Sequence, residues 1–173
     1  MGLADRRRGS PRFCIMYDIQ LFGRIEVRTR GIRLAGDDFG GDRPRQLLAL
    51  LALHGEQSLV ELSDLLGAPP ATVKADLRVL RDRLEPGASG RDSVVVGRHG
   101  SYHLDTERVR VDVATFEKLL AAAEGRTPER AARPLTAASY VAARPLLEDE
   151  DAAWAAELRA KYDAKRRLTA TAA

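Results

Sequence analysis

Basic side chains recur at helical spacing in the stretch ATVKADLRVLRDRLE, residues 71–85. An α-helix turns about 100° per residue, so side chains three or four positions apart share a face. One face of this stretch is apolar and suited to burial; it carries Val73, Leu77, Leu80 and Leu84. A second face, about a quarter turn away, is basic and carries Lys74, Arg78 and Arg81, with Glu85 near its end. Such a face binds phosphate or guanine, or is simply the solvated side of an amphipathic helix.

Other chemistry-bearing residues do not assemble into a site. His99 and His103 are four residues apart, but we expect them on a hairpin, and no third ligand is near in sequence. The glycine-rich segment 36–41 lacks the Gly-Lys-Ser/Thr that follows in a phosphate-binding loop. No nucleophile, base and orienting group come together. We therefore expect a protein without catalytic, metal or cofactor chemistry.

The segment before residue 71 predicts a small sheet followed by helices. Apolar residues alternate over residues 17–36, with Gly23 and Gly31 at the turns, as in an antiparallel sheet. Asp42 can cap a helix that has Pro44 in its first turn and that ends near Gly55.

A second helix is predicted from the sequence Ser58-Leu59-Val60-Glu61, which has the pattern of a capping box. This helix runs to Leu66, with Leu62, Leu65 and Leu66 facing inward, and Gly67 ends it. Residues 93–105 predict a hairpin whose turn, at residues 97–100, carries Arg98 and His99. Sheet, helices and hairpin together predict a winged helix-turn-helix over residues 17–105.

Residues 106–173 predict a small all-α module. One helix spans 114–124. A second helix is signalled at Thr127-Pro128, but Pro134 is expected either to be its true start or to kink it. The acidic run 148–151 is predicted to be a solvated loop. Trp154, Leu158 and Tyr162 line one face of a last helix. The fold class is therefore α+β, with an N-terminal antiparallel sheet, a winged helix-turn-helix and a helical module.

Composition gives weaker information about function. The chain has 173 residues and a net charge of only +3, and residues 43–105 hold eight basic and eight acidic side chains. Residues 1–16 are expected to form a disordered basic leader, without the apolar segment of a signal peptide. Cys14 is the single cysteine, and the longest apolar run, Leu47–Leu53, is too short to cross a membrane. A cytoplasmic protein that does not enter a membrane is expected.

Longer segments resemble a known family of bacterial regulators. Three segments resemble an OmpR/PhoB-type winged helix: RQLLALLALHGEQSLVELSDLLG, PPATVKADLRVLRDRLEPGA and GSYHLD. Two later segments resemble the opening helices of the bacterial transcriptional activation domain, a TPR-like domain. They are VDVATFEKLLAAAE and YVAARPLLEDEDAAWAAELRAKYDA. In this order the segments resemble the antibiotic-regulatory-protein (SARP) class of activators. The resemblance covers roughly residues 17–168, with a shorter connection at 67–72 and about half the usual activation domain.

The resemblance implies a one-component transcription regulator that binds double-stranded DNA. Helix 71–85 would enter the major groove, wing 97–100 would approach the minor groove, and the helical module would dimerise or contact RNA polymerase. Carried over by position, the DNA-facing residues would be Thr72, Lys74, Arg78, Arg81, Arg98 and His99. The balanced charge of residues 43–105 leaves a second hypothesis open. In it the winged helix is a protein-interaction module with weak or no DNA binding, which docks to RNA polymerase or another regulator.

Overall fold

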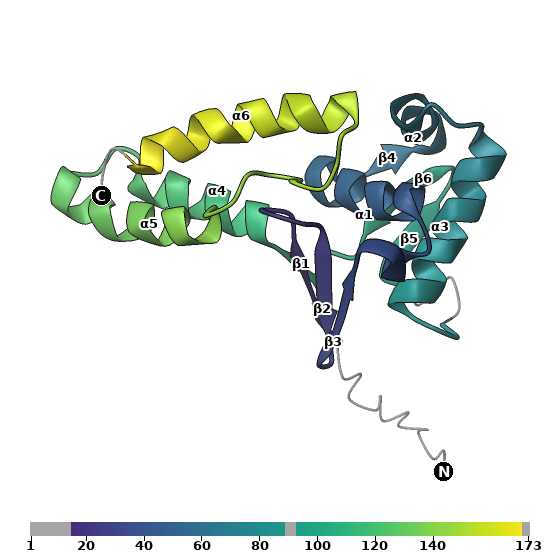
Figure 1. The fold of residues 1–173 in the computed structure, drawn as a ribbon. Helices are drawn as coiled ribbons and strands as arrows, with labels where there is room; N and C mark the ends of the chain where they lie inside the picture. The colour runs from purple at the N-terminus through teal and green to yellow at the C-terminus, as the bar shows by residue number, and fades with distance from the viewer. Residues whose placement is uncertain (1–14, 89–92, 171–173) are drawn as a thin grey trace, which may run out of the picture.

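The computed structural model describes residues 15–88 and 93–170, and Figure 1 shows its mixed α+β architecture. A sheet near the N-terminus lies between a winged helix on one side and a bundle of C-terminal helices on the other. The predicted fold class is confirmed. Nearly all of the predicted leader, including the arginines at positions 6–8 and Cys14, falls outside the described residues.

The N-terminal sheet contains the three predicted antiparallel strands and one that the sequence did not reveal. Strand order is β3-β2-β1-β7. The bounds are β1 (Tyr17–Gln20), β2 (Glu26–Thr29), β3 (Ile32–Ala35) and β7 (Val109–Val111). Strand β7 runs parallel to β1, with Ile19 opposite Val111. Its three residues are too few to show a period, and its partner is about ninety positions earlier in the chain.

The winged helix follows in the expected order of elements. A 3-10 turn η1 (Gly36–Phe39) precedes three helices: α1 (Asp42–His54), α2 (Leu59–Leu66) and α3 (Pro70–Leu84). A short strand β4 (Gln57–Ser58) separates α1 from α2. Strands β5 (Val95–Arg98) and β6 (Ser101–Leu104) form the hairpin, and β4 pairs with β6 to give the sheet order β4-β6-β5.

Local signals account for the helix starts, with two corrections. The capping box of α2 is present: Glu61 N donates to Ser58 Oγ at 3.2 Å, and Ser58 N donates to Glu61 Oε2 at 2.7 Å. Helix α1 is capped by Gly41 rather than Asp42, which becomes its first residue. Leu65 was expected to face inward but is 37% exposed, because the buried face of α2 is centred on Leu62 and Ser63 and Leu65 lies at its edge.

The C-terminal helices are α4 (Asp112–Ala123), α5 (Pro128–Val141) and α6 (Ala153–Ala170). Helix α5 starts at Pro128, with Thr127 as its N-cap, and continues through Pro134, so the expected start at Pro134 is wrong. A proline inside a helix removes one backbone donor, and packing of α5 against α4 and α6 can outweigh that loss. Tyr162 is buried on α6, and Trp154 and Leu158 pack against the same core, as predicted.

The core runs without a break from the winged helix into the C-terminal helices. Phe22 at the end of β1 stacks edge-on against Phe116 of α4, with ring centroids 5.1 Å apart. Asp112, at the start of α4, accepts hydrogen bonds from Leu21 N at 2.9 Å and Phe22 N at 2.8 Å. Burial raises the pKa of Asp112, although these backbone donors oppose the rise. Side-chain packing and hydrogen bonds to the Asp112 carboxylate therefore cross the boundary that the sequence predicts at residues 105/106.

The two central residues of the acidic run after α5 are not solvated, although Glu148 and Asp151 are exposed. Glu150 is 4% exposed, and its carboxylate accepts from Gln46 Nε2 at 2.9 Å and pairs with Arg45 at 3.4 Å. Asp149 pairs with Arg45 at 3.2 Å and accepts from Ile25 N at 3.1 Å. The expectation of a solvated loop was wrong because these carboxylates meet an arginine of α1 about a hundred positions earlier.

Candidate nucleic-acid interface

Helix α3 buries the face that the sequence predicts. Val73, Leu77 and Leu80 are at most 1% exposed, and Leu84 is 6% exposed. These side chains join the core formed with α1 and α2. The rest of the helix surface is divided into two flanks, which differ in what their side chains contact.

Lys74 and Arg78 form the accessible part of the basic flank. Both side chains are exposed, and within the described residues neither makes an ion pair or a side-chain hydrogen bond. They lie four positions apart and therefore project from the same side of α3 on successive turns. Two unpaired cations with this spacing are free to bind an anionic partner.

Arg81 lies on the same flank but is held by the hairpin. Its Nε donates to Val95 O at 2.9 Å, and its guanidinium lies 5.8 Å from the centroid of the Tyr102 ring. Gly97 leaves room for this contact: a Cβ there would lie 3.0 Å from Arg81 Nη2 and 2.9 Å from Tyr102 Cε1. Arg81 thus fixes the wing against α3, a role that the sequence did not indicate.

Glu85 does not close the basic face, contrary to the prediction. Its side chain is 7% exposed and accepts from Val94 N at 2.6 Å. The other carboxylate oxygen pairs with Arg108. Position 85 follows the last turn of α3, where the backbone leaves helical geometry, so extrapolating the helical period fails there. The acid expected on the basic face is neutralised inside the molecule.

Thr72 lies on the opposite flank from Lys74. It is half-buried, and its helical neighbours four and seven positions on are Asp76 and Val79. Asp76 on this flank accepts from Arg43 Nε of α1 at 2.6 Å. Exposed Arg83 belongs to the same flank, near Gly40 of the η1 segment. The carboxylate of Asp76 is therefore paired with Arg43 on the flank opposite the basic one. Asp82 is exposed on the outer surface of α3.

Arg98 and His99 are both exposed at the end of the hairpin. The turn is shorter than predicted: Gly97 and Arg98 still belong to β5, and only His99 and Gly100 connect the strands. Both connecting residues have positive φ, 49° and 84°, as a two-residue type I′ hairpin turn requires. Leu59 N donates to Gly100 O at 2.9 Å, so the turn is tied to the start of α2.

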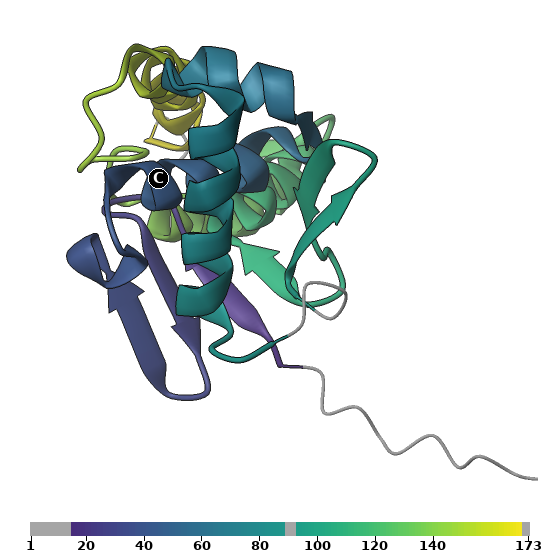
Figure 2. The ribbon, with the colours of Figure 1, turned by 90° about the vertical axis from the view of Figure 1, so that its right-hand side faces the viewer.

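The wing and α3 lie side by side (Figure 2). The hairpin runs from near the C-terminal end of α3 alongside that helix, and its tip points toward the N-terminal half of α3. The exposed cations Lys74 and Arg78 therefore lie on the flank of α3 that also carries the partly buried Arg81, and the exposed Arg98 lies on the wing that Arg81 contacts. A polyanion lying along α3 could contact both elements.

Residues 15–88 and 93–170 contain neither a metal-binding cluster nor a membrane-spanning helix. No group of three or more His, Cys, Asp or Glu side chains in this part of the chain could hold a metal ion. No helix there is both long and apolar enough to span a bilayer.

The fold and this surface define a winged helix-turn-helix with a helical extension. Among solved structures, the chain is similar to Mycobacterium tuberculosis EmbR in complex with a low-affinity phosphopeptide, with a TM-score of 0.73 and 23% sequence identity. The likeness covers 91% of this chain but 44% of the EmbR chain, so this chain spans less than half of that protein's length. No family model and no curated protein matches the sequence. At this identity the likeness concerns the fold.

Proposed function

We propose that this chain is a transcription regulator that binds double-stranded DNA through α3 and the wing. The observation that carries the proposal is the pair of exposed, unpaired cations Lys74 and Arg78 beside a wing held by Arg81. An α-helix fits the major groove, and arginine or lysine there binds guanine or phosphate. Arg98 and His99 complete the proposed contact surface, with the wing at the minor groove. Thr72, which the sequence predicted for this surface, lies on the opposite flank of α3 and is left out of it.

A salt titration of binding to duplex DNA of random sequence tests this proposal. Each phosphate that is neutralised lowers the slope of log K against log salt by about 0.9, so contacts from Lys74, Arg78 and Arg98 give a slope of about −3. Absence of binding at low salt, or binding that does not change with salt, would contradict the proposal. Affinity is expected to be modest, because this surface holds few cations and Asp82 opposes them.

A second candidate function is docking to a protein, with RNA polymerase as the proposed partner. It is favoured by apolar side chains on the outer surface of α2, where Val60 is 64% and Leu65 37% exposed. Val60→Asp should then weaken binding to purified RNA polymerase without changing DNA binding. Equal polymerase binding by the wild type and this variant would remove α2 as the docking surface.

The helical module formed by α4, α5 and α6 is proposed to dimerise or to contact polymerase. EmbR supports the arrangement of this module on the winged helix, because 91% of the chain superposes. The phosphopeptide belongs to the EmbR structure, and more than half of the EmbR chain lies outside the overlap. Sedimentation velocity over a range of concentrations would test dimerisation directly.

A further inference from the structure

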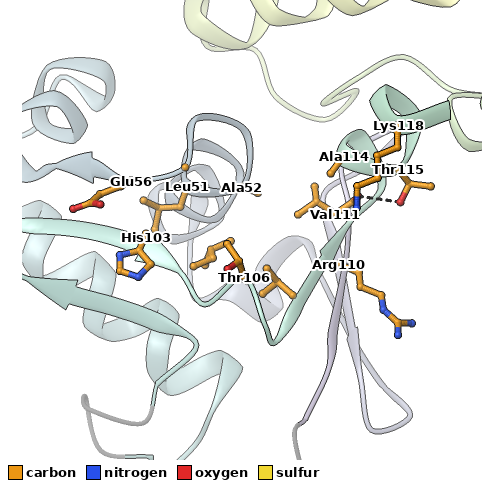
Figure 3. Close-up of a pocket in the computed structure, with 13 residues that line it drawn as sticks. Leu51, Ala52, Glu56, His103, Thr106, Arg110, Val111, Ala114, Thr115 and Lys118 are labelled. Atoms are coloured by element: carbon orange, nitrogen blue, oxygen red, sulfur yellow. Dashed lines mark hydrogen bonds between the residues drawn. The ribbon is translucent and has the colours of Figure 1, made fainter. Parts of the chain in front are cut away.

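A pocket of about 540 Å³ lies between the winged helix and the first helix of the C-terminal module (Figure 3). One wall consists of the end of α1 and of β6; the other consists of β7 and the start of α4. Pockets that hold small organic ligands commonly measure about 300–1,000 Å³ and often lie where two structural units meet. Neither α3 nor the wing turn lines this pocket, so it is separate from the proposed DNA surface.

The interior of the pocket is apolar. Leu51 of α1 and Leu104 of β6 contribute buried side chains, 2% and 4% exposed. Ala52, Val109 and Val111 add partly buried apolar surface from both walls. Covering such a surface removes it from water, at about 25 cal/mol for each Å² buried. A ligand therefore gains affinity here by placing an apolar body between α1 and β7.

The rim of the pocket carries charges of opposite sign on its two sides. Figure 3 shows Lys118 and Thr115 of α4 on one side, and Glu56 and His103 on the other. Lys118 is exposed and makes no ion pair with any residue in the described part of the chain. Arg110 also lines the pocket, but its side chain points away from the labelled residues around it (Figure 3). Lys118 is thus the cation best placed for a ligand.

We infer that this pocket binds a small amphipathic organic acid, with its apolar body between α1 and β7 and its single acidic group at Lys118. The unpaired ammonium of Lys118 favours one carboxylate or sulfonate at that side of the rim. Glu56 on the opposite side would repel a second anionic group, so a monoanion fits better than a dianion. Because one ligand would touch both walls, its binding should also stabilise the junction between them.

Two fluorescent probes of nearly the same shape test the inference. Anilinonaphthalene sulfonate has an aromatic body and one sulfonate, whereas N-phenyl naphthylamine has the same rings and no charge. Titration of the full chain with the sulfonate probe should show saturable binding. Lys118→Gln should weaken binding of the sulfonate probe about two- to fivefold, as expected for one exposed ion pair, and leave the neutral probe unchanged.

Pocket-filling variants locate the binding site. Ala114→Trp places an indole against the pocket from α4, and affinity for both probes should fall at least about tenfold, since the apolar body loses its space. Ala121→Trp is the matched control, because Ala121 is an exposed alanine of the same helix that does not line the pocket. If Ala114→Trp unfolds, Thr106→Trp fills the pocket from an exposed loop position instead.

Three results would overturn the inference. One is the absence of saturable binding by the wild-type chain, and another is unchanged binding in a folded pocket-filling variant. The third is a Lys118→Gln variant that affects the sulfonate and neutral probes equally. All titrations are done without DNA, so the outcome is independent of whether the chain binds DNA.

Discussion

Neighbouring charged residues on α3 have different roles, depending on what surrounds each side chain. Lys74 and Arg78 project into solvent, whereas Arg81 is bound to Val95 O and lies near the Tyr102 ring. Glu85 is turned inward to Val94 N and Arg108. Substitutions at these positions should therefore separate effects on binding from effects on stability.

Replacing Arg78 with alanine should weaken binding to duplex DNA by about 1–3 kcal/mol if it contacts a base, and by less if it contacts a phosphate. Thermal stability should change by no more than about 0.5 kcal/mol, because the side chain is exposed and unpaired in the described structure. Affinity is measured by fluorescence anisotropy with labelled duplex.

Arg83→Ala is the control for this substitution, because Arg83 is an exposed arginine of α3 on the opposite flank. It should reduce DNA affinity less than Arg78→Ala does. A larger effect of Arg83→Ala would mean that the other flank of α3 faces the DNA.

Tyr17 should make stability depend on alkaline pH. Its burial, followed by the charge and hydrogen bond of Glu85, raises the pKa of Tyr17 from 10.0 to about 12. Below the pKa that Tyr17 has in the unfolded chain, the folded and the unfolded state both keep the phenol proton. Tyr17 then does not make the free energy of unfolding depend on pH. As pH rises through that value the unfolded tyrosine ionises first, so the free energy of unfolding falls until the folded pKa is passed.

Urea unfolding at a series of alkaline pH values measures this dependence. Tyr17→Phe should lose less stability than the wild type over the interval between the two pKa values. Tyr140→Phe, at a ring that is 78% exposed, serves as the control for the removal of a hydroxyl. Identical pH dependence in Tyr17→Phe and the wild type would contradict the assignment.

At the scale of elements, two arginines connect parts of the chain that are distant in sequence. Arg81 connects α3 to β5, and Arg45 connects α1 to the segment before α6. Arg159 of α6 binds the same segment, donating to Leu146 O at 3.0 Å and Leu147 O at 2.7 Å. The segment between α5 and α6 is therefore fixed from both sides.

Arg45→Ala should destabilise the fold by about 3–5 kcal/mol, because it leaves buried Glu150 and partly buried Asp149 without their cation. Arg43→Ala on the same helix is the matched control. Arg43 is 50% exposed in its pair with Asp76, and such pairs contribute about 0–1 kcal/mol. Chemical denaturation measures both. Equal effects of the two substitutions would show that Arg45 is not needed to neutralise the acidic segment.

At the scale of the whole molecule, the winged helix and the C-terminal helices share one core. Tyr162 of α6 lies 6.0 Å from Phe22, which follows β1, measured between ring centroids, and Tyr162 Oη donates to Glu117 of α4 at 2.9 Å. Strand β7 completes the sheet begun by β1, and Leu147 N donates to Leu21 O at 2.8 Å. Folding of either part on its own would expose this junction to water.

We predict a single cooperative unfolding transition for the full chain, and a fragment of residues 15–105 that does not fold stably. The fragment would lack β7, which pairs with the edge of β1, and Phe116 and Leu146, which contact Phe22. Differential scanning calorimetry and circular dichroism measure both. Two separate transitions in the full chain, or a folded fragment, would instead support independent domains on either side of residue 105.

Short-range periodicity determined much of this protein by itself. The apolar faces of α3 and α6, the capping box of α2, the N-terminal antiparallel strands and the hairpin were predicted, because each depends on residues a few positions apart. The place of His99 in the hairpin turn was predicted too, whereas Arg98 proved to be the last residue of β5. The sequence did not determine which charged side chains remain free to bind a partner.

Only the tertiary structure decided which groups Arg81, Glu85 and Glu150 contact, and that β7 forms. Each of these features depends on a partner from a distant part of the chain, such as Val95, Arg108 or Arg45. A charged side chain looks the same in the sequence whether it faces water or a buried counter-charge. The free energy of that partner contact, set by the fold, determines which role it takes.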